Sequence, residues 1–466
     1  MRSALLASVA LAALSTAHAA DAWHDKARVM LDHAVNIPTV IGRGKVPELA
    51  AYFASQFSMA GWPETDIHVM PYETGGDKTA ALIVRWRAAG HPKQKPIMLM
   101  GHMDVVEAKR EDWQTSDPFT FTEKDGYYYG RGTIDMKDGD VAIVTALLKL
   151  KESGFKPKRD IVVFFTGDEE TNGIGARLGA TDWHGMLDVE YGLNADAGDG
   201  AFRKDGKAIG FFFNTAEKTF TDFTLTARNR GGHSSKPRPD NAIYQLAGAL
   251  KRLEAYRFEP QLNETTRAYF NERQKNEPGP LGDAMRAWLK NPNDGKAADV
   301  IEADESEVGL TRTRCVATML SGGHALNALP QLAQANINCR IMPGVDPNET
   351  FAELKRIVDD PNVIVTRVDD FKASLASPLR PDVLNAFGDA VHARWPGVAI
   401  IPEMSTGASD ARDFRIAGIP VYGTGGAWVV VPDDLRAHGR DERLPVGALD
   451  DNVHHFERMV RVLAGT

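Results

Sequence analysis

The sequence predicts an α/β fold of two domains, with a smaller α+β domain inserted into a larger one. Apolar runs of strand length alternate with helical patterns in the first and last parts of the chain, as in a layered α/β protein. Residues 161–165 are all apolar, which is typical of a strand covered on both faces. Residues 220–227 instead alternate apolar and polar side chains, as an antiparallel strand with one wet face does. The 466 residues also exceed the roughly 250–300 that one core supports.

The larger domain shows this alternation before about residue 213 and again after about residue 380. Its predicted helices have apolar residues at three- and four-residue spacing, and its predicted strands are short apolar runs. The expected elements are a helix at 25–60, strands at 80–86 and 96–100, a helix at 138–153, a strand at 160–166 and a terminal helix at 453–464.

The middle of the chain predicts a β-α-β-β-α-β set of elements. A polar stretch at about 258–310, with clusters of Pro, Asn and Gly, is interpreted as an insertion that contains one helix at 283–290. The expected elements are a strand at 220–227, a helix at 241–256, strands at 312–320 and 332–342, a helix at 350–358 and a strand at 362–368.

The first twenty residues have the pattern of a secretory signal peptide. Arg2 supplies a positive start, residues 4–14 are almost wholly apolar, and Ala17-His18-Ala19 fits the small-x-small cleavage site. We therefore expect cleavage near Ala19 or Ala20 and a secreted or periplasmic protein. An uncleaved membrane anchor is the alternative, although the apolar run is short and no later segment reaches about 18 uninterrupted apolar residues.

The net charge and the cysteine content exclude some classes of protein and of metal site. The net charge of −9 argues against a general nucleic-acid binder, which usually carries a basic patch. The two cysteines, Cys315 and Cys339, exclude a Cys-x-x-Cys metal site. In an oxidising compartment they can pair, since they flank a turn-like segment near Asn327. Two reduced, buried cysteines are the other interpretation, which the sequence slightly favours.

Polar residues with metal-binding chemistry follow several of the predicted strands. His102 and Asp104 lie two positions apart at a strand end, so they share a face, and Asp104 can orient a group beside His102. Asp135 lies in a glycine-rich loop before a helix. Its carboxylate can bridge two cations, or it can simply belong to a turn that caps the helix.

Two adjacent carboxylates follow the apolar strand, where open α/β sheets place their ligands. Glu170 can bind a metal, while Glu169 beside it receives the proton of the metal-activated water. Asp196 and His438 can complete the two coordination shells, because imidazoles and carboxylates are the ligands that a zinc pair needs. An exposed acidic turn is the alternative for Glu169 and Glu170.

These residues belong to a longer series of motifs that resembles one enzyme family, the cocatalytic dizinc metallopeptidases and aminoacylases. Its members include glutamate carboxypeptidase, succinyl-diaminopimelate desuccinylase, acetylornithine deacetylase and carnosinase. The resemblance covers nearly the whole mature chain. The motifs are Gly-His102-Met-Asp104-Val-Val, Asp117-Pro-Phe, Tyr129-Gly-Arg-Gly-Thr-Ile-Asp135-Met-Lys-Asp-Gly, Asp168-Glu169-Glu170, Gly231-Gly-His233-Ser-Ser-Lys-Pro, Asn327-Ala-Leu-Pro330, Cys339-Arg340-Ile-Met-Pro343-Gly, Ser409-Asp410-Ala411-Arg412 and His438-Gly-Arg-Asp-Glu442.

The resemblance implies two Zn²⁺ ions per subunit, with Co²⁺ or Mn²⁺ as alternatives, because affinity and availability together select the metal. It implies the following roles: one zinc on His102 and Asp196, a second on Glu170 and His438, Asp135 as the bridge, Glu169 as general base, Asp104 as support for His102, His233 as oxyanion donor, and Asn327 and Arg340 as substrate contacts.

The resemblance also implies the domain organisation and the partners. A zinc-exopeptidase catalytic domain on a mixed sheet would comprise 21–214 and 375–466, after a signal peptide at 1–20. A ferredoxin-like lid or dimerisation domain would comprise 215–374, and a homodimer through it is expected. The partners would be a small peptide or an N-acyl amino acid, with no nucleic acid and no stable membrane span after signal cleavage.

The expected function is zinc-dependent hydrolysis of peptide bonds in small peptides by a carboxypeptidase or dipeptidase. Export and the sequence around Asp196 favour this branch over the nearest alternative, an N-acyl-amino-acid amidohydrolase. Where many relatives have proline, Glu107 and Ala108 follow Asp-Val-Val, so substrate preference does not transfer from them. A remote alternative is an inactive metal-binding scaffold, and a serine hydrolase is disfavoured because no Gly-x-Ser-x-Gly elbow occurs.

Overall fold

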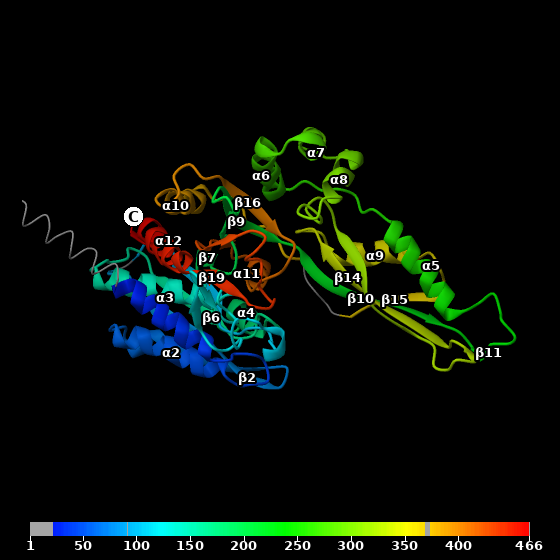
Figure 1. The fold of residues 1–466 in the computed structure, drawn as a ribbon, viewed down its shortest axis with the longest axis horizontal. Helices are drawn as coiled ribbons and strands as arrows, with labels where there is room; N and C mark the ends of the chain where they lie inside the picture. Colours follow the sequence, from blue (N-terminus) through cyan, green and yellow to red (C-terminus); the bar gives the residue numbers. More distant parts are fainter. Residues whose placement is uncertain (1–21, 91, 369–372, 466) are drawn as a thin grey trace, which may run out of the picture. The chain divides into compact units, whose positions relative to one another are not determined.

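A computed structural model describes residues 22–90, 92–368 and 373–465 (Figure 1). The described chain forms two compact units. The first contains the residues up to 214, 379–401 and those from 417 onward, and the second contains 215–378 and 402–416. The sequence interpretation assigned 215–374 to the inserted domain and did not include 402–416. The predicted signal peptide lies outside the described residues.

The first unit is built on a large mixed sheet, as the sequence predicted. Its central strands β6, β3, β7 and β17 are parallel neighbours, and antiparallel strands flank them. The strand order is β1 (Ile67–Thr74), β2 (Asp77–Trp86), β6 (Ile161–Thr166), β3 (Ile97–His102), β7 (Tyr191–Asn194), β17 (Val421–Gly423), β9 (Ala208–Glu217), β8 (Gly200–Phe202) and β18 (Trp428–Val430), with β16 (Ile400–Ser405) paired to β9.

Helices pack on this sheet and bury its apolar side chains. All six residues of β3 and all six of β6 are buried, which explains why these strands are apolar almost throughout. Helix α3 (Lys137–Glu152) contacts α2 (Val46–Met59), α12 (Val446–Gly465) and β3, so nearly all of its residues are buried too. The remaining elements are α4 (Ile174–Ala180), α10 (Pro381–His392) and a small sheet of β19 (Arg443–Pro445), β5 (Tyr127–Tyr129) and β4 (Thr122–Lys124).

The single helix predicted at 25–60 is two helices. The first spans 22–36 and the second is α2, with an irregular segment between them. Pro38 lies in that segment, and Gly42 and Gly44 have positive φ values of 84° and 60°. A proline and two glycines with positive φ do not continue a helix. The prediction of one helix across both periodic segments was therefore wrong.

The second unit contains the predicted β-α-β-β-α-β arrangement. Its sheet has the order β12-β14-β10-β15, and every neighbouring pair is antiparallel, which is the ferredoxin-like topology. Helices α5 and α9 share one hydrophobic core with the sheet, through residues such as Leu246, Leu354 and Phe223. The elements are β10 (Thr219–Arg228), α5 (Ala242–Ala255), β12 (Arg314–Gly322), β14 (Leu332–Ile341), α9 (Pro347–Val358) and β15 (Val363–Arg367).

The polar stretch at about 258–310 contains three helices, where the sequence predicted one. They are α6 (Glu264–Arg273), α7 (Gly279–Lys290) and α8 (Gly295–Glu302). Trp288 is fully buried and packs edge-on against Phe270 at 5.3 Å between ring centroids. Asn263 caps α6 and Asp294 caps α8 through their side chains. These caps lie within the polar clusters that were interpreted as loop, which is why the helices were missed.

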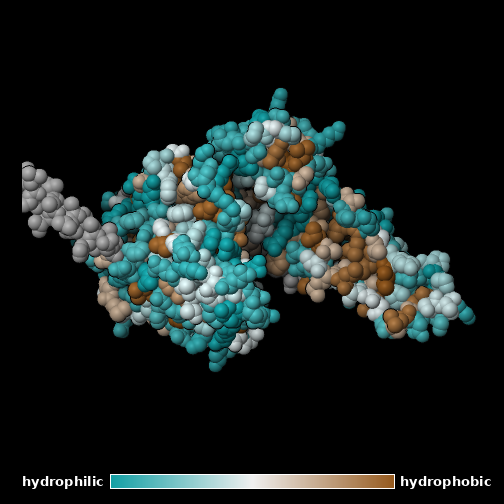
Figure 2. All heavy atoms as spheres, viewed as in Figure 1, coloured by the Kyte–Doolittle hydropathy of each residue, from teal (hydrophilic) through white to brown (hydrophobic). Residues whose placement is uncertain are grey.

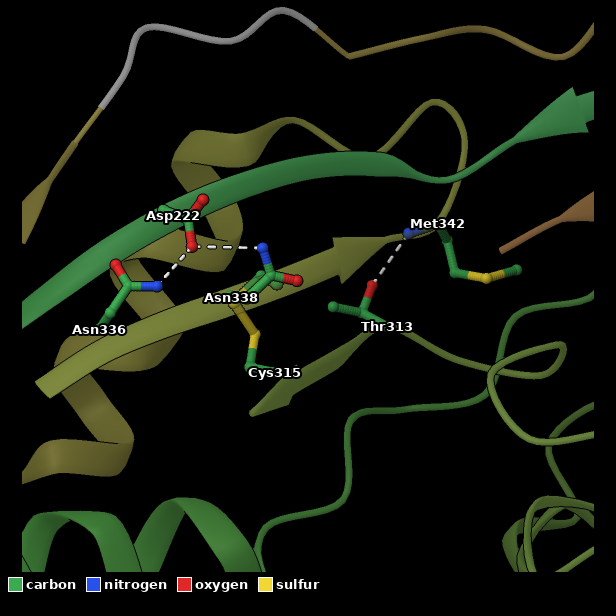
Figure 3. The surroundings of a disulfide bond; sticks show 7 residues. Asp222, Thr313, Cys315, Asn336, Asn338 and Met342 are labelled. Atoms are coloured by element: carbon green, nitrogen blue, oxygen red, sulfur yellow. Dashed lines mark hydrogen bonds between the residues drawn. A yellow bond between two sulfur atoms is a disulfide. The ribbon is translucent and has the colours of Figure 1, made fainter. Parts of the chain in front are cut away.

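Cys315 and Cys339 form a disulfide, which corrects the slight preference for two reduced cysteines (Figure 3). Strands β12 and β14 pair in a register that places the two residues directly opposite each other. On the neighbouring strand β10, Asp222 accepts hydrogen bonds from Asn336 and Asn338 of β14, at 2.7 and 3.2 Å (Figure 3). Sequence spacing alone does not reveal strand register, so it left both interpretations open.

We expect the double substitution Cys315→Ser and Cys339→Ser to lower the free energy of unfolding by about 2–4 kcal/mol, since the disulfide restricts the unfolded chain. Denaturant unfolding without reductant measures the loss. Reductant should destabilise the original protein and leave the double variant unchanged. Equal stability of the two proteins without reductant would contradict this prediction.

Among the described residues, no helix combines the length and the apolar character needed to cross a membrane.

Candidate functional site

The ends of three neighbouring parallel strands position the predicted metal ligands. β3 ends at His102 and lies between β6 and β7, parallel to both. β6 ends at Thr166, opposite His102, and the chain then passes through Glu169 and Glu170. β7 ends at Asn194, two residues before Asp196. Because parallel strands end at the same edge of a sheet, residues more than ninety positions apart meet there.

The structure brings all five predicted ligands together in the first unit. His102 Nε2 lies 3.3 Å from Asp135 Oδ1 and 3.7 Å from Asp196 Oδ1. His438 Nε2 lies 3.1 Å from Asp135 Oδ2 and 2.9 Å from Glu170 Oε1. The two oxygens of Asp135 therefore each face one imidazole, as a bridging carboxylate requires. His102 is buried, while the His438 side chain is 55% exposed.

The electrostatics of this cluster fit divalent cations. Burial acts against charge on Asp135, but His102 and His438 hold the pKa of this carboxyl well below its usual range. The carboxylates of Asp135 and Glu170 accept hydrogen bonds from the His438 imidazole, and this raises the pKa of His438 to about 10. Burial raises the pKa of Asp196 to about 6. The clustered carboxylates of Asp135, Glu170 and Asp196 thus favour protonated imidazoles. A bound cation can replace those protons.

The donor atoms also have the arrangement that a metal needs. Ligand atoms of His102, Asp135 and Glu170 all lie within 4.8 Å of one another. The buried Nε2 of His102 has no hydrogen-bond partner of acceptable geometry among the described residues. Its Nδ1 lies 3.0 Å from the carbonyl oxygen of Asp104, so the ring is oriented with Nε2 toward the carboxylates. Two imidazoles and three carboxylates suit a pair of zinc-like ions.

Asp104 contacts both sides of the cluster. Its carbonyl oxygen contacts His102, and its carboxylate oxygen Oδ1 lies 3.6 Å from His102 Nδ1. The same carboxylate accepts the backbone N–H groups of Glu169 and Glu170, at 3.1 and 3.0 Å. The backbone carbonyl and the side chain of Asp104 both lie next to His102, so the expected support of His102 by Asp104 stays a prediction. The same side chain also holds the turn that carries the two glutamates.

Two residues that organise the site were not assigned a role from the sequence. Asp168 is buried and accepts the Tyr72 hydroxyl at 2.6 Å and the N–H groups of Ile174 and Gly175 at 2.7 and 2.9 Å. It therefore satisfies the first N–H groups of α4 and fixes the turn from Asp168 to Gly173, which contains Glu169. The acidic residue ahead of a short helix was the available signal.

Glu442 is the second such residue, and it holds the loop of Asp135. Its Oε1 accepts the N–H groups of Gly132, Ile134 and Asp135, at 2.9, 3.0 and 3.2 Å. Its Oε2 pairs with Arg131 Nη1 at 2.5 Å, and both side chains are almost fully buried. Burial raises the pKa of Glu442 to about 7. The sequence placed Glu442 in the same motif as His438, but its partners lie more than three hundred residues away.

The three predicted residues His233, Asn327 and Arg340 belong to the second unit. His233 lies in β11 (Gly232–His233), which pairs with β13 (Ala328–Leu329), and the Ser234 N–H donates to the Asn327 carbonyl at 3.0 Å. Arg340 is near the end of β14, with its guanidinium 5.1 Å from the Phe220 ring centre. It forms no ion pair with a carboxylate in the part of the chain that the structure describes. The structure thus places the segment of His233 next to that of Asn327, and the roles of all three residues stay predictions.

Fold and site together define a metal-dependent hydrolase of the metallopeptidase and amidohydrolase type. The model of Peptidase family M20/M25/M40 matches residues 98–462, and the chain belongs to this family. The resemblance inferred from the motifs is confirmed.

Three relatives show the breadth of the family. The chain is 28% identical over 392 residues to "Probable carboxypeptidase S-like 2" of Dictyostelium discoideum, covering 82% of this chain and 74% of that protein. It is 28% identical over 381 residues to the human "N-fatty-acyl-amino acid synthase/hydrolase PM20D1", covering 79% of this chain and 74% of that protein. An M20 family metallo-carboxypeptidase from Sulfolobus solfataricus has the same fold, with a TM-score of 0.69 and 16% identity. The match covers 94% of this chain and 99% of that chain.

Proposed function

We propose that this enzyme is a zinc-dependent exopeptidase that hydrolyses peptide bonds in small peptides. The observation that carries the proposal is the set of five ligands around Asp135, with the backbone of Glu169 held by Asp104 beside them. His102 and Asp196 would hold one ion, Glu170 and His438 the other, and Asp135 would contact both. Bound zinc would supply Lewis acidity, which lowers the pKa of water and polarises the scissile carbonyl.

Glu169 would move the protons of the reaction. It is partly buried and adjacent to the ligand Glu170, and its N–H donates to Asp104. A carboxylate in this position can accept a proton from the attacking water as the new C–O bond forms. It can then deliver the same proton to the leaving amine as the C–N bond breaks, so proton and charge balance are preserved.

The second unit would supply the groups that recognise the substrate. His233 would donate a hydrogen bond to the tetrahedral oxyanion, from the same chain or from a partner subunit. Arg340 would bind the terminal carboxylate of the substrate, because a guanidinium without a carboxylate partner can form two parallel hydrogen bonds to it. Asn327 would contact the substrate from the strand pair that carries His233.

Hydrolysis of N-acyl amino acids is the second candidate. The human relative named above is described as an N-fatty-acyl-amino acid synthase/hydrolase, which supports this branch. An N-acyl amino acid and a peptide both present an amide bond and a terminal carboxylate. The same zinc ligands, Glu169 and Arg340 would therefore serve either substrate.

Export and dimerisation are further parts of the proposal. The N-terminal pattern supports cleavage near Ala19 and a secreted or periplasmic enzyme.

A homodimer through the second unit is supported by β12, which is an edge strand with Val316, Met319 and Leu320 exposed by 53%, 72% and 69%. Figure 2 shows apolar surface over this unit. Such an unprotected edge is suited to pairing with another strand. Sedimentation at micromolar concentration tests whether the protein is a dimer.

Amine release from a panel of substrates tests the proposed function. The panel contains dipeptides, longer peptides, the same peptides as C-terminal amides, and N-acyl amino acids, each with zinc-loaded and chelated protein. Release from peptides with a free carboxylate, lost on chelation and on amidation, supports an exopeptidase. Release from N-acyl amino acids alone would move the enzyme to the amidohydrolase branch. Release that resists chelation would refute the metal mechanism.

A further inference from the structure

The loop that carries His233 is held by several hydrogen bonds within the second unit. Arg238 donates hydrogen bonds to the Gly231 carbonyl at 2.5 Å, to the Asn229 side chain, and to Asp240 at 2.8 Å. Gly231 has a φ of 72°, and a Cβ there would lie only 2.7 Å from Gln331. Arg238 and this glycine therefore stabilise the conformation of the loop, in which β11 pairs with β13.

Two groups of Ser235 lie within hydrogen-bond distance of one nitrogen of His233. The Ser235 backbone N–H points at His233 Nδ1 with a separation of 3.2 Å, and the Ser235 hydroxyl lies 2.8 Å from the same atom. A backbone N–H can only donate, so Nδ1 must supply the lone pair. A neutral imidazole carries its single proton on the other nitrogen when one nitrogen accepts. The contact thus selects the tautomer with hydrogen on Nε2.

We propose that Ser235 is a positioning residue that fixes His233 as the Nε2–H tautomer and aims Nε2 away from the loop. This inference rests on the proposed function, in which His233 donates to the oxyanion, because only a protonated Nε2 can make that bond. His233 forms no ion pair with a carboxylate among the residues described, so no acidic partner competes for the opposite tautomer. The Lys236 N–H donates to the His233 carbonyl at 3.0 Å and closes the turn around Ser235.

Nitrogen NMR of histidine-labelled protein tests the tautomer without reference to activity. His233→Gln identifies the resonances, and the spectra are recorded at alkaline pH. We expect Nδ1 to resonate as an unprotonated nitrogen and Nε2 as a protonated one. A protonated Nδ1, or two tautomers in similar amounts, would overturn the proposal. Because the readout is the ring itself, this result is independent of whether the enzyme cleaves peptides.

Kinetics then test the positioning role. Ser235→Ala removes one of the two donors, and we expect kcat to fall about two- to tenfold with KM unchanged, the effect of losing one hydrogen bond. Ser235→Thr should restore kcat. Ser234→Ala is the matched control, since the Ser234 hydroxyl is exposed and has no hydrogen bond among the described residues. Equal effects of the two alanine substitutions, or a change confined to KM, would refute a positioning role.

His233 itself gives a second kinetic test of the same idea. A glutamine amide can place an N–H near the Nε2 position, and an asparagine amide places one near Nδ1. We expect His233→Gln to retain more kcat than His233→Asn. The reverse order would contradict donation from Nε2. If no variant and not even the original protein turns over any substrate, the proposed function fails, while the NMR result still decides the tautomer.

Discussion

Replacing Glu169 by glutamine is expected to lower kcat by about 10²–10⁴-fold, the usual contribution of a general acid–base group. Glutamine has nearly the same shape as glutamate but cannot accept a proton from water or carry it to the leaving amine. The backbone N–H of residue 169 would still donate to Asp104, so the turn should keep its form. Glu170 and the other ligands are untouched, so metal content should not change.

Single-turnover kinetics with metal analysis of the same samples measures this effect. Glu152→Gln is a matched control, because Glu152 is an exposed carboxylate at the end of α3. We expect that control to retain full activity. Near-normal turnover of Glu169→Gln would exclude Glu169 as the proton carrier, and a loss of metal would show that Glu169 supports binding instead.

Replacing Glu442 by alanine is expected to have the largest effect on the integrity of the site. The Glu442 carboxylate accepts three N–H groups from the loop of Asp135 and pairs with the buried Arg131. Its removal leaves a buried guanidinium without its carboxylate and the loop without its anchor. Breaking a buried pair in this way costs about 3–5 kcal/mol. Loss of an outer support of a metal ligand lowers metal affinity about 10–100-fold.

Denaturant unfolding and metal titration measure the two effects separately. Glu442→Gln is the informative comparison, because its amide oxygen can still accept the loop N–H groups while the charge facing Arg131 is lost. We expect the glutamine variant to lie between the original protein and the alanine variant in both measurements. If Glu442→Ala binds metal as tightly as the original protein, the loop of Asp135 does not depend on this anchor.

The elements that the sequence predicted well have local signals. Residues 161–165 are apolar because both faces of β6 are covered, and β10 alternates because only one face is. The prediction of elements was wrong where the sequence pattern was interrupted or was equally typical of a helix start and of a loop. Pro38 and two glycines interrupt a helical pattern that continues on both sides. Helices α6 and α8 are capped by Asn263 and Asp294, which lie in polar clusters that also suit loops.

The sequence by itself determined the type of fold and the candidate ligands. Periodicity reports burial along a single strand or helix, and His102, Asp135, Glu170, Asp196 and His438 stand next to such elements in recognisable motifs. These signals depend only on neighbours in the chain.

Only the tertiary structure decided which distant groups meet. The pairing of Cys315 with Cys339 follows from the register of β12 against β14. The support of Asp135 by Glu442 joins residues 307 positions apart. Hydrogen bonds and disulfides act over a few ångströms and require direction, and such geometry exists only after the chain has folded.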